Sequence, residues 1–409
     1  MISFSDKSAF MYPLGRRRRS DRLRRTDRPP GSAKEIVMEY TDLPGAPMLP
    51  YNARGRQSGS IVMRAIDSHF HWYPRSVFEE LCARTGYPRA VPTASGGYTV
   101  MPREGVSRVD QWDEWFDLEA QLAHMDSTGR HFGVVCTLGP FGAYFSEVSA
   151  AHGLAAAQMW NEEMAGAQAR YPGRVWASGV VPLQDTKMAV DELERMIGKL
   201  GLMGVNVPSS IGPKGHIDEA RLEPFYERVE QLGVPIFLHP TDIAFDEILA
   251  GYDGALFNSL GRVIEVSVAA YRLVLSGIME RHPDLKVFMS HTGGALPYQA
   301  GRMDKNSKAA KLPKLPSTYL RRMYTDTVSP HAMGMKFAID FYGVDHVLYG
   351  DDYPCWNPET ALGIFDELDL SQDDRHKILY GNARRVFKLR DPAPAATGER
   401  SPAVNLEIT

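Results

Sequence analysis

Two spacings of hydrophobic residues alternate along this chain. Short apolar runs typical of buried strands are followed by stretches in which apolar residues recur every three or four positions, as on one face of a helix. The predicted strands are residues 61–63, 132–138, 175–183, 203–207, 234–239, 285–290, 321–326 and 346–349. The predicted helices are residues 112–125, 150–170, 188–200, 219–232, 260–281, 332–341, 360–368 and 373–387. Since strands that alternate with helices pair in parallel, about eight such units predict an α/β protein with a closed (β/α)8 TIM barrel.

Three segments do not follow this alternation. Residues 73–110 contain many Pro and Gly and are longer than an ordinary connection, so we expect an insertion that forms a lid or pocket wall. Residues 1–60 are rich in arginine and turn-forming residues, and we expect a disordered basic extension. Residues 391–409 are expected to form a flexible tail. The barrel domain, with extra helices at its C-terminal end, is therefore predicted for residues 61–390.

The composition restricts the class of protein. Among 409 residues, 44% are hydrophobic and 23% are charged, which is typical of a globular protein. A net charge of -4 argues against a nucleic-acid-binding protein, and no apolar run reaches the roughly 18 residues needed to span a membrane. The cysteines Cys82, Cys136 and Cys355 are too few and too scattered for a disulfide framework, so a reducing cytoplasm is the expected location.

Candidate metal ligands gather where predicted strands end, which is where barrel enzymes carry their active sites. These residues are His69 and His71 after the first strand, His239 after the fifth, His291 after the sixth and Asp352 after the eighth. In an extended segment the period of two turns His69 and His71 to the same side. Each residue alone fits a core histidine or a turn carboxylate, but their coincidence at one rim favours a shared site.

Not all five groups need to bind metal. Three histidines, one aspartate and a water would satisfy a mononuclear site and leave the fifth group for acid–base chemistry. The fourth predicted strand, residues 203–207, does not end in a lysine, so a carbamylated lysine that bridges two metal ions has no candidate there. We therefore expect one divalent ion per chain.

The ordered set of motifs resembles a known family. These motifs are His69-Phe70-His71, His239-Pro240, residues 290–294 (Ser-His-Thr-Gly-Gly) running on to Pro297 and Gly301-Arg302, and residues 350–354 (Gly-Asp-Asp-Tyr-Pro). Together they resemble the amidohydrolase-2 group of the amidohydrolase superfamily. Within it they are most similar to aminocarboxymuconate semialdehyde decarboxylase and related metal-dependent decarboxylases.

The resemblance assigns roles to these residues. It implies that His69, His71, His239 and Asp352 hold zinc or manganese and that His291 is the acid–base group. Gly293-Gly294 would let the backbone approach the ligand or metal shell closely, although turn formation also explains these glycines.

A homodimer is also implied by the resemblance. Arg302 matches an arginine that such decarboxylases place in the neighbouring subunit's site, where it holds a substrate carboxylate. A solvent-facing helical arginine explains the sequence nearly as well.

Two departures from the family pattern concern the ligand and the substrate. Asp351 places a second carboxylate beside Asp352, so the two could be confused as ligands. Gln121 and Ala123 stand where the semialdehyde decarboxylase carries arginines, which argues against its substrate. Trp72 and Tyr353 lie near the predicted rim and could stack on a planar substrate, although aromatic residues there also form pocket walls or core.

The expected activity is non-oxidative decarboxylation of an aromatic or unsaturated, oxygen-substituted carboxylic acid. A divalent ion would draw off the charge left on carbon, and Asp352 or His291 would deliver the proton. The first alternative is a hydrolase or hydratase in which a metal-activated water attacks a lactone, ester, amide or double bond. The second is a binding protein without catalytic activity on the same barrel.

Overall fold

The computed structural model describes residues 65–101, 104, 109–111, 113–127, 132–139, 148–211, 215–241, 246–249, 251–329 and 331–389. The predicted basic extension, the predicted first strand at residues 61–63 and the predicted tail from residue 391 lie outside these residues.

Seven parallel strands form the main sheet, in the order β1-β5-β6-β7-β8-β9-β10. Their bounds are β1 (Ala65–His71), β5 (Phe132–Thr137), β6 (Val175–Val180), β7 (Gly204–Pro208), β8 (Pro235–His239), β9 (Lys286–Met289) and β10 (Tyr324–Thr325). Each strand pairs in parallel with the next strand of the sheet along the chain. This neighbour-to-neighbour order is the one that repeated strand–helix units produce.

Residues 347–353 close the sheet between β10 and β1. The amide of Leu348 donates to the carbonyl of Thr325 at 2.8 Å, and the amide of Ser68 donates to the carbonyl of Tyr349 at 2.8 Å. This segment was predicted as the eighth strand, but within the described residues it forms only isolated parallel bridges. The ring of strands is nevertheless complete, and the predicted barrel is confirmed.

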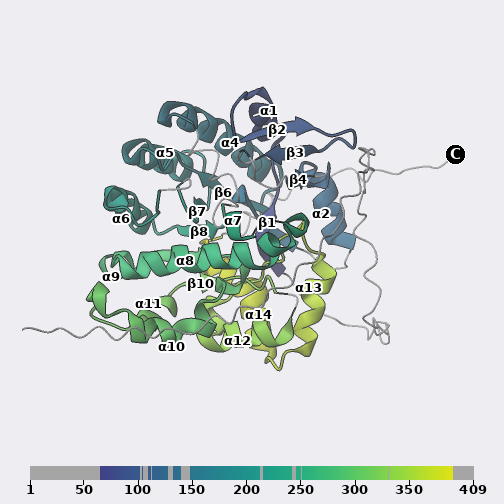
Figure 1. The fold of residues 1–409 in the computed structure, drawn as a ribbon. Coiled ribbons are helices and arrows are strands. Elements are labelled where there is room, and N and C mark those ends of the chain that lie inside the picture. Colours follow the sequence, from purple (N-terminus) through teal and green to yellow (C-terminus); the bar gives the residue numbers. More distant parts are fainter. Residues whose placement is uncertain are drawn as a thin grey trace, which may run out of the picture. The chain divides into compact units, whose positions relative to one another are not determined.

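Helices follow the strands and lie outside them, as Figure 1 shows around the central labels β1, β6, β7 and β8. The main ones are α4 (Ala150–Arg170), α5 (Thr186–Gly198), α6 (Glu223–Leu232), α8 (Arg262–Leu275), α10 (Leu296–Asn306) and α12 (Ala332–Tyr342). Shorter helices are α7 (Asp246–Leu249), α9 (Ile278–Arg281), α11 (Pro316–Leu320), α13 (Pro358–Ile364), α14 (Gln372–His376) and α15 (Asn382–Val386). In α8 the buried residues Val266, Ala269, Ala270 and Leu273 follow helical spacing, so one face of the helix packs on the barrel.

Two long predicted helices are interrupted. The segment predicted at residues 260–281 divides into α8 and α9 because Gly277 adopts a left-handed conformation with φ of 81°. The segment predicted at residues 373–387 divides into α14 and α15, with a π-helical turn at Lys377–Gly381 between them.

The predicted insertion at residues 73–110 contains helix α1 (Arg75–Ala83) and most of a small antiparallel sheet. Its strands are β2 (Arg89–Pro92), β3 (Tyr98–Met101) and β4 (Val109–Gln111), and helix α2 (Leu118–Ser127) follows. In Figure 1 this sheet lies beside α1 at the top of the view. Helix α1 was not predicted, although Val77, Phe78 and Leu81 bury one of its faces.

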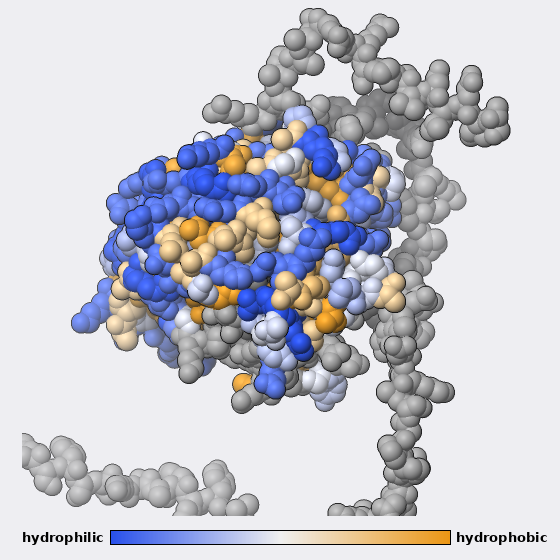
Figure 2. Space-filling model, turned by 90° about the horizontal axis from the view of Figure 1, so that it is seen from above, coloured by the Kyte–Doolittle hydropathy of each residue, from blue (hydrophilic) through white to orange (hydrophobic). Residues whose placement is uncertain are grey.

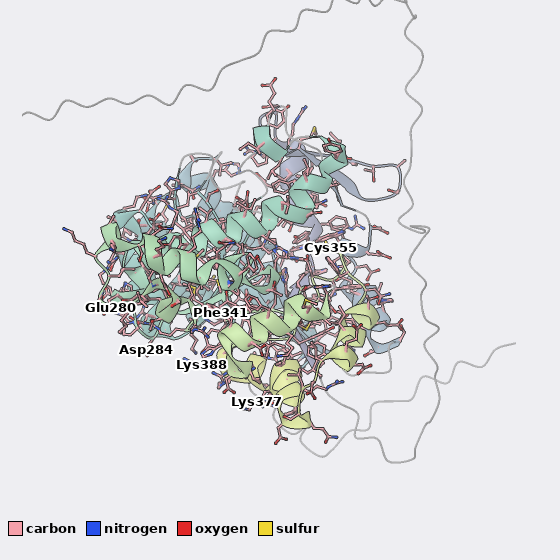
Figure 3. The ribbon with its side chains drawn as sticks, turned by 60° about the horizontal axis from the view of Figure 1, so that its bottom comes forward. Glu280, Asp284, Phe341, Cys355, Lys377 and Lys388 are labelled. Atoms are coloured by element: carbon pink, nitrogen blue, oxygen red, sulfur yellow. The ribbon has the colours of Figure 1, made fainter. Side chains whose placement is uncertain are left out.

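The two ends of the barrel can be told apart in Figure 3. Asp284 precedes β9, and the side chain of Lys388 donates to the carbonyl of Leu232 before β8, so both mark the amino ends of the strands. Cys355 follows Asp352 by three residues and lies apart from Asp284 and Lys388 in that view. In barrel enzymes the active site lies at the carboxyl ends of the strands, so we expect the chemistry at the end that carries Asp352.

The surface seen in Figure 2 is mostly hydrophilic, with hydrophobic residues in small groups. Within the part of the chain that the structure describes, no helix combines the length and the apolar character needed to cross a membrane.

Candidate metal centre

Four side chains meet at the carboxyl end of the barrel. His69, His71, His239 and Asp352 each offer one ligand atom, and these atoms all lie within 4.8 Å of one another. The Nε2 atoms of His69 and His71 are 3.2 Å apart, and Oδ1 of Asp352 lies 2.9 Å from Nε2 of His71 and 3.3 Å from Nε2 of His69. Ligands at ordinary metal–nitrogen distances around a tetrahedral ion are roughly 3.3 Å apart. The spacing therefore fits the coordination shell of one divalent ion.

The two ligands of β1 lie inside the strand. β1 begins at Ala65 and ends at His71, so both histidines belong to the strand itself. The strand predicted at residues 61–63 lies outside the described residues. The register of the pairing with β5 shifts between Asp67 and Phe70, as at a β-bulge or a similar irregularity. Bulges are common beside active sites because they redirect side chains.

The ring of His239 is held in the tautomer that can bind a cation through Nε2. Its Nδ1 atom lies 3.0 Å from the carbonyl of Pro240, an acceptor, so Nδ1 carries the proton and Nε2 carries the lone pair. Nε2 is buried and has no hydrogen-bond partner among the described residues. Burial lowers the pKa of His239 well below its ordinary value, and the neighbouring His71 and His69 lower it further. A neutral imidazole with an unpaired buried nitrogen is the form that binds metal.

Gly139 lies against the rings of two of the four donors, His71 and His239. A Cβ atom at this position would lie 2.6 Å from Cε1 of His71 and 3.3 Å from Cε1 of His239, and the backbone has φ of +36°. Only glycine leaves space for both imidazoles here.

Charges within the site are strongly coupled. Burial alone would raise the pKa of Asp352, but His69, His291 and His71 hold it well below its usual range. Burial lowers the pKa of His69, but the carboxylates of Asp352 and Asp326 outweigh it and raise that pKa to about 9. Because a ligand must be deprotonated, a metal that binds here displaces a proton from His69.

His291 lies beside the four donors without being one of them. Its Nε2 atom is 3.6 Å from Oδ2 of Asp352, and its ring centre is 5.4 Å from that of His69 and 5.7 Å from that of His239. Nδ1 of His291 is buried and has no hydrogen-bond partner among the described residues. This position leaves His291 available for acid–base chemistry next to the metal.

The structure separates the two adjacent aspartates. Asp351 accepts hydrogen bonds from the amide of Tyr353 at 3.0 Å and from the hydroxyl of Tyr349 at 2.9 Å, whereas Asp352 faces the histidines. Burial raises the pKa of Asp351, and burial together with the charge of Asp351 raises that of Asp67. The additional carboxylate thus lies apart from the histidines, and the amide of Asp351 donates to Oδ1 of Asp67 at 3.3 Å.

Asp326 was missed by the sequence analysis. Its Oδ2 atom lies 2.6 Å from Nδ1 of His69, and both residues are fully buried. The predicted strand at residues 321–326 ends in this aspartate, so the inspection of strand ends could have found it. Trp115 was also missed as a neighbour of the site, and its ring stacks on His71 with a centroid distance of 5.6 Å.

The predicted substrate-binding residues lie in different environments. Trp72 is partly buried and donates from Nε1 to the carbonyl of Phe116 at 3.2 Å. The buried ring of Tyr353 stacks on Phe70 and on His124, with centroid distances of 5.7 and 5.4 Å. The rings of Phe70 and His124 therefore already stack on Tyr353, which we expected to stack on a substrate. Arg302 is exposed on α10, and no contact with the four donors is found within the described residues.

Gly293 and Gly294 serve helix packing. A Cβ atom at Gly293 would lie 2.2 Å from the hydroxyl of Tyr342, and one at Gly294 would lie 2.4 Å from the carbonyl of Val263. Both glycines have positive φ, 71° and 61°. They let the turn after His291 pack against α12 and α8. At these two positions the backbone therefore lies close to other protein atoms.

Curated relatives of this chain include two decarboxylases. Gamma-resorcylate decarboxylase of Polaromonas sp. (strain JS666 / ATCC BAA-500) is 32% identical over 245 residues, which cover 56% of this chain and 75% of the relative. 2-Amino-3-carboxymuconate-6-semialdehyde decarboxylase of Dictyostelium discoideum is 29% identical over 244 residues, which cover 58% of this chain and 67% of the relative.

The fold is similar to that of solved enzymes. A crystal structure of dihydroxybenzoic acid decarboxylase from Polaromonas sp. JS666, with bound manganese and the inhibitor 2-nitroresorcinol, superposes with a TM-score of 0.64. The two sequences are 25% identical, and the match covers 79% of this chain and 96% of the other. The amidohydrolase family model Amidohydro_2 matches residues 66–389. This chain therefore belongs to the amidohydrolase family, in its amidohydrolase-2 group.

Proposed function

We propose that this protein is a metal-dependent, non-oxidative decarboxylase of an aromatic or unsaturated, oxygen-substituted carboxylic acid. The observation that carries the proposal is the buried set of three histidines and one aspartate within 4.8 Å, with His291 directly beside it. The two curated relatives described above are decarboxylases, which supports the same reaction class. His69, His71, His239 and Asp352 are the proposed ligands of one Mn²⁺ or Zn²⁺.

A divalent ion in this site supplies a Lewis acid for a substrate oxygen near the departing carboxylate. The reaction breaks the carbon–carbon bond to the carboxylate, releases carbon dioxide and leaves an electron pair on carbon. A proton must then reach that carbon. We assign this proton to His291, because the depressed pKa of Asp352 disfavours its protonated form. Asp352, 3.6 Å from Nε2 of His291, orients the imidazole.

A homodimer would complete the site with Arg302. The residue is exposed on α10, and the same helix exposes 79% of Tyr298. The ring of Tyr298 lies 6.4 Å from that of Phe337 on α12, which is 46% exposed, and Met333 on α12 is 74% exposed. An apolar face with an exposed arginine beside it suits a second copy of this chain, into whose site Arg302 would bring a positive charge for the substrate carboxylate.

Light scattering tests the dimer. We expect a mass of two chains for the purified protein, and Arg302→Ala should keep that mass while its KM for the acid rises. A monomer that is fully active would reject the role of Arg302 in a neighbouring site.

The chain has three cysteines, and two of them, Cys82 and Cys136, are free thiols in the part of the chain that the structure describes. Free thiols persist in a reducing compartment. We propose on this ground that the protein works in the cytoplasm.

The decisive experiment combines metal content with product analysis. The purified protein is incubated with hydroxybenzoates, muconate-type acids and lactones, and carbon dioxide and organic products are measured. About one metal ion per chain and carbon dioxide from one of the acids would support the proposal. Metal together with water addition, and no carbon dioxide, would instead assign a hydrolase or hydratase. Protein that binds no metal would return us to a binding function.

A further inference from the structure

Asp326 accepts hydrogen bonds from two separate parts of the site, His69 in β1 and the turn that follows β9. The residue follows β10 and is fully buried. Its Oδ2 atom accepts from Nδ1 of His69 at 2.6 Å and from the amide of His291 at 2.9 Å. Its Oδ1 atom accepts from the amides of Thr292 at 2.8 Å and Val328 at 3.1 Å. Three of these four partners are backbone amides, which can only donate, so the carboxylate accepts throughout.

The contact with His69 sets which ring nitrogen faces the metal. A carboxylate acceptor holds the proton on Nδ1, so the lone pair lies on Nε2, the atom that is 3.3 Å from Oδ1 of Asp352. Such outer carboxylates fix the tautomer and the ring orientation of metal-binding histidines and strengthen the ligand.

The contacts with residues 291 and 292 stabilise an unusual backbone. His291 and Thr292 have φ of 55° and 54°, in the left-handed region that residues with a side chain seldom adopt. Asp326 accepts a hydrogen bond from each of their amides, one with each carboxylate oxygen. This backbone sets the direction from which the imidazole of His291 approaches Asp352.

We propose that Asp326 is a positioning residue that holds the metal ligand His69 and the acid–base residue His291 in register with one another. The inference rests on the proposed metal site and on the role of His291, but its test needs only metal and no substrate. One buried carboxylate thereby fixes the position of His69 relative to His291.

The test compares Asp326→Asn with Thr325→Val. In Asp326→Asn, one oxygen becomes an NH₂ group, so two of the four N–H donors lose their acceptor in either orientation of the amide. Thr325→Val is the matched control, because Thr325 is equally buried in β10 and its hydroxyl bonds only the carbonyl of Met289 among the described residues. Mn²⁺ affinity is measured by competition with a chelator, and amide exchange at residues 291 and 292 by NMR.

We expect Asp326→Asn to bind Mn²⁺ about 10–100-fold more weakly, the usual cost of a lost or weakened outer-shell partner, because a neutral amide is a weaker acceptor for His69 than a carboxylate even where its oxygen faces that ring. Either the amide of His291 or that of Thr292 should exchange faster, because one of the two faces the new NH₂ group. Thr325→Val should stay within about threefold of the wild type in affinity, since it leaves the partner of His69 in place. Wild-type affinity in a folded Asp326→Asn would overturn the inference. Weaker metal binding with unchanged exchange would also overturn it, because His291 would then be held independently.

A second measurement needs no variant. In the Zn²⁺-loaded wild type, ¹⁵N-histidine NMR should show a slowly exchanging proton on Nδ1 of His69. Absence of this proton would reject the role of Asp326 even if Asp326→Asn does not fold. Failure of the wild type to bind Mn²⁺ or Zn²⁺ would instead overturn the proposed metal site itself, so the two failures are distinguishable.

Discussion

His291 and Asp352 face each other across the site, with Nε2 of His291 3.6 Å from Oδ2 of Asp352. The other oxygen of the same carboxylate, Oδ1, lies 2.9 Å from Nε2 of His71. One aspartate therefore points one oxygen toward the proposed ligand His71 and the other toward His291, the proposed acid–base group. This geometry suggests different roles for the histidines on the two sides of Asp352. Metal content and turnover of histidine variants can measure these roles separately.

Replacing His291 by alanine should abolish turnover and leave the metal in place. The four proposed ligands remain, whereas the group assigned to proton transfer is gone, and such groups contribute about 10²–10⁴-fold to the rate. Metal content by elemental analysis and carbon dioxide release measure the two effects separately. Loss of metal from His291→Ala would show that this histidine is itself a ligand.

Replacing His239 by alanine should lower the metal content of the purified protein. The substitution removes the buried Nε2 atom that has no hydrogen-bond partner among the described residues. His216→Ala is the control, because His216 is exposed after β7 and is not one of the four donors. We expect His216→Ala to keep its metal. Equal metal content in both variants would remove His239 from the ligand set.

Gly139→Ala should weaken metal binding without touching a ligand. The new methyl group would lie 2.6 Å from Cε1 of His71, so the ring must move. Disturbed ligand orientation typically costs at least about tenfold in affinity. Gly166→Ala in α4 is the control, since nothing lies within 4 Å of its added Cβ. Removing a helical glycine should stabilise that variant by about 0.5–1 kcal/mol and leave its Mn²⁺ affinity unchanged. Unaltered affinity in Gly139→Ala would mean that the ring of His71 can move away from the new methyl group without loss of metal binding.

The alternation of strands and helices was sufficient to place the donors of the metal centre. His239 ends β8 and Asp352 follows the segment that closes the barrel, so the topology alone brings them to one rim. Asp326 ends the predicted strand at residues 321–326, but its contact with His69 could not be predicted from the sequence. β10 has only two residues, Tyr324 and Thr325, and the partner of Asp326 is His69, 257 positions earlier in the chain. A hydrogen bond over this separation leaves no periodic signal in the sequence.

The direction of individual side chains was the other feature that could not be predicted from the sequence. Tyr353 follows the proposed ligand directly, yet its ring is buried against Phe70. Asp352 has φ of 60°, so the direction of the next side chain could not be predicted from the regular alternation of a strand. Helix α1 escaped because its segment is bordered by prolines, Pro74 before it and Pro88 after it, although Phe78 and Leu81 are fully buried.

Glu223 should make the stability of the protein depend on pH far from the metal. The guanidinium of Arg281 binds both of its carboxylate oxygens, at 2.6 and 2.7 Å, and this contact lowers the pKa of Glu223. A carboxyl group with a lower pKa in the folded state stabilises the fold above its unfolded pKa of about 4.3, and the stabilisation is lost as the pH falls through the folded value. Glu223→Gln should therefore unfold at a lower temperature than the wild type at pH 7, and the difference should shrink below about pH 4.

The expected size at pH 7 is at most about 1 kcal/mol, because the pair is partly exposed and solvent screens it. Thermal unfolding with EDTA present removes any contribution from bound metal. Glu227→Gln on the same helix α6 is the control, since Glu227 forms no ion pair among the described residues and its Oε1 atom accepts only from Gln231, at 3.2 Å. A deficit in Glu223→Gln that is as large at pH 3 as at pH 7 would contradict the assignment, because protonated Glu223 can no longer attract Arg281.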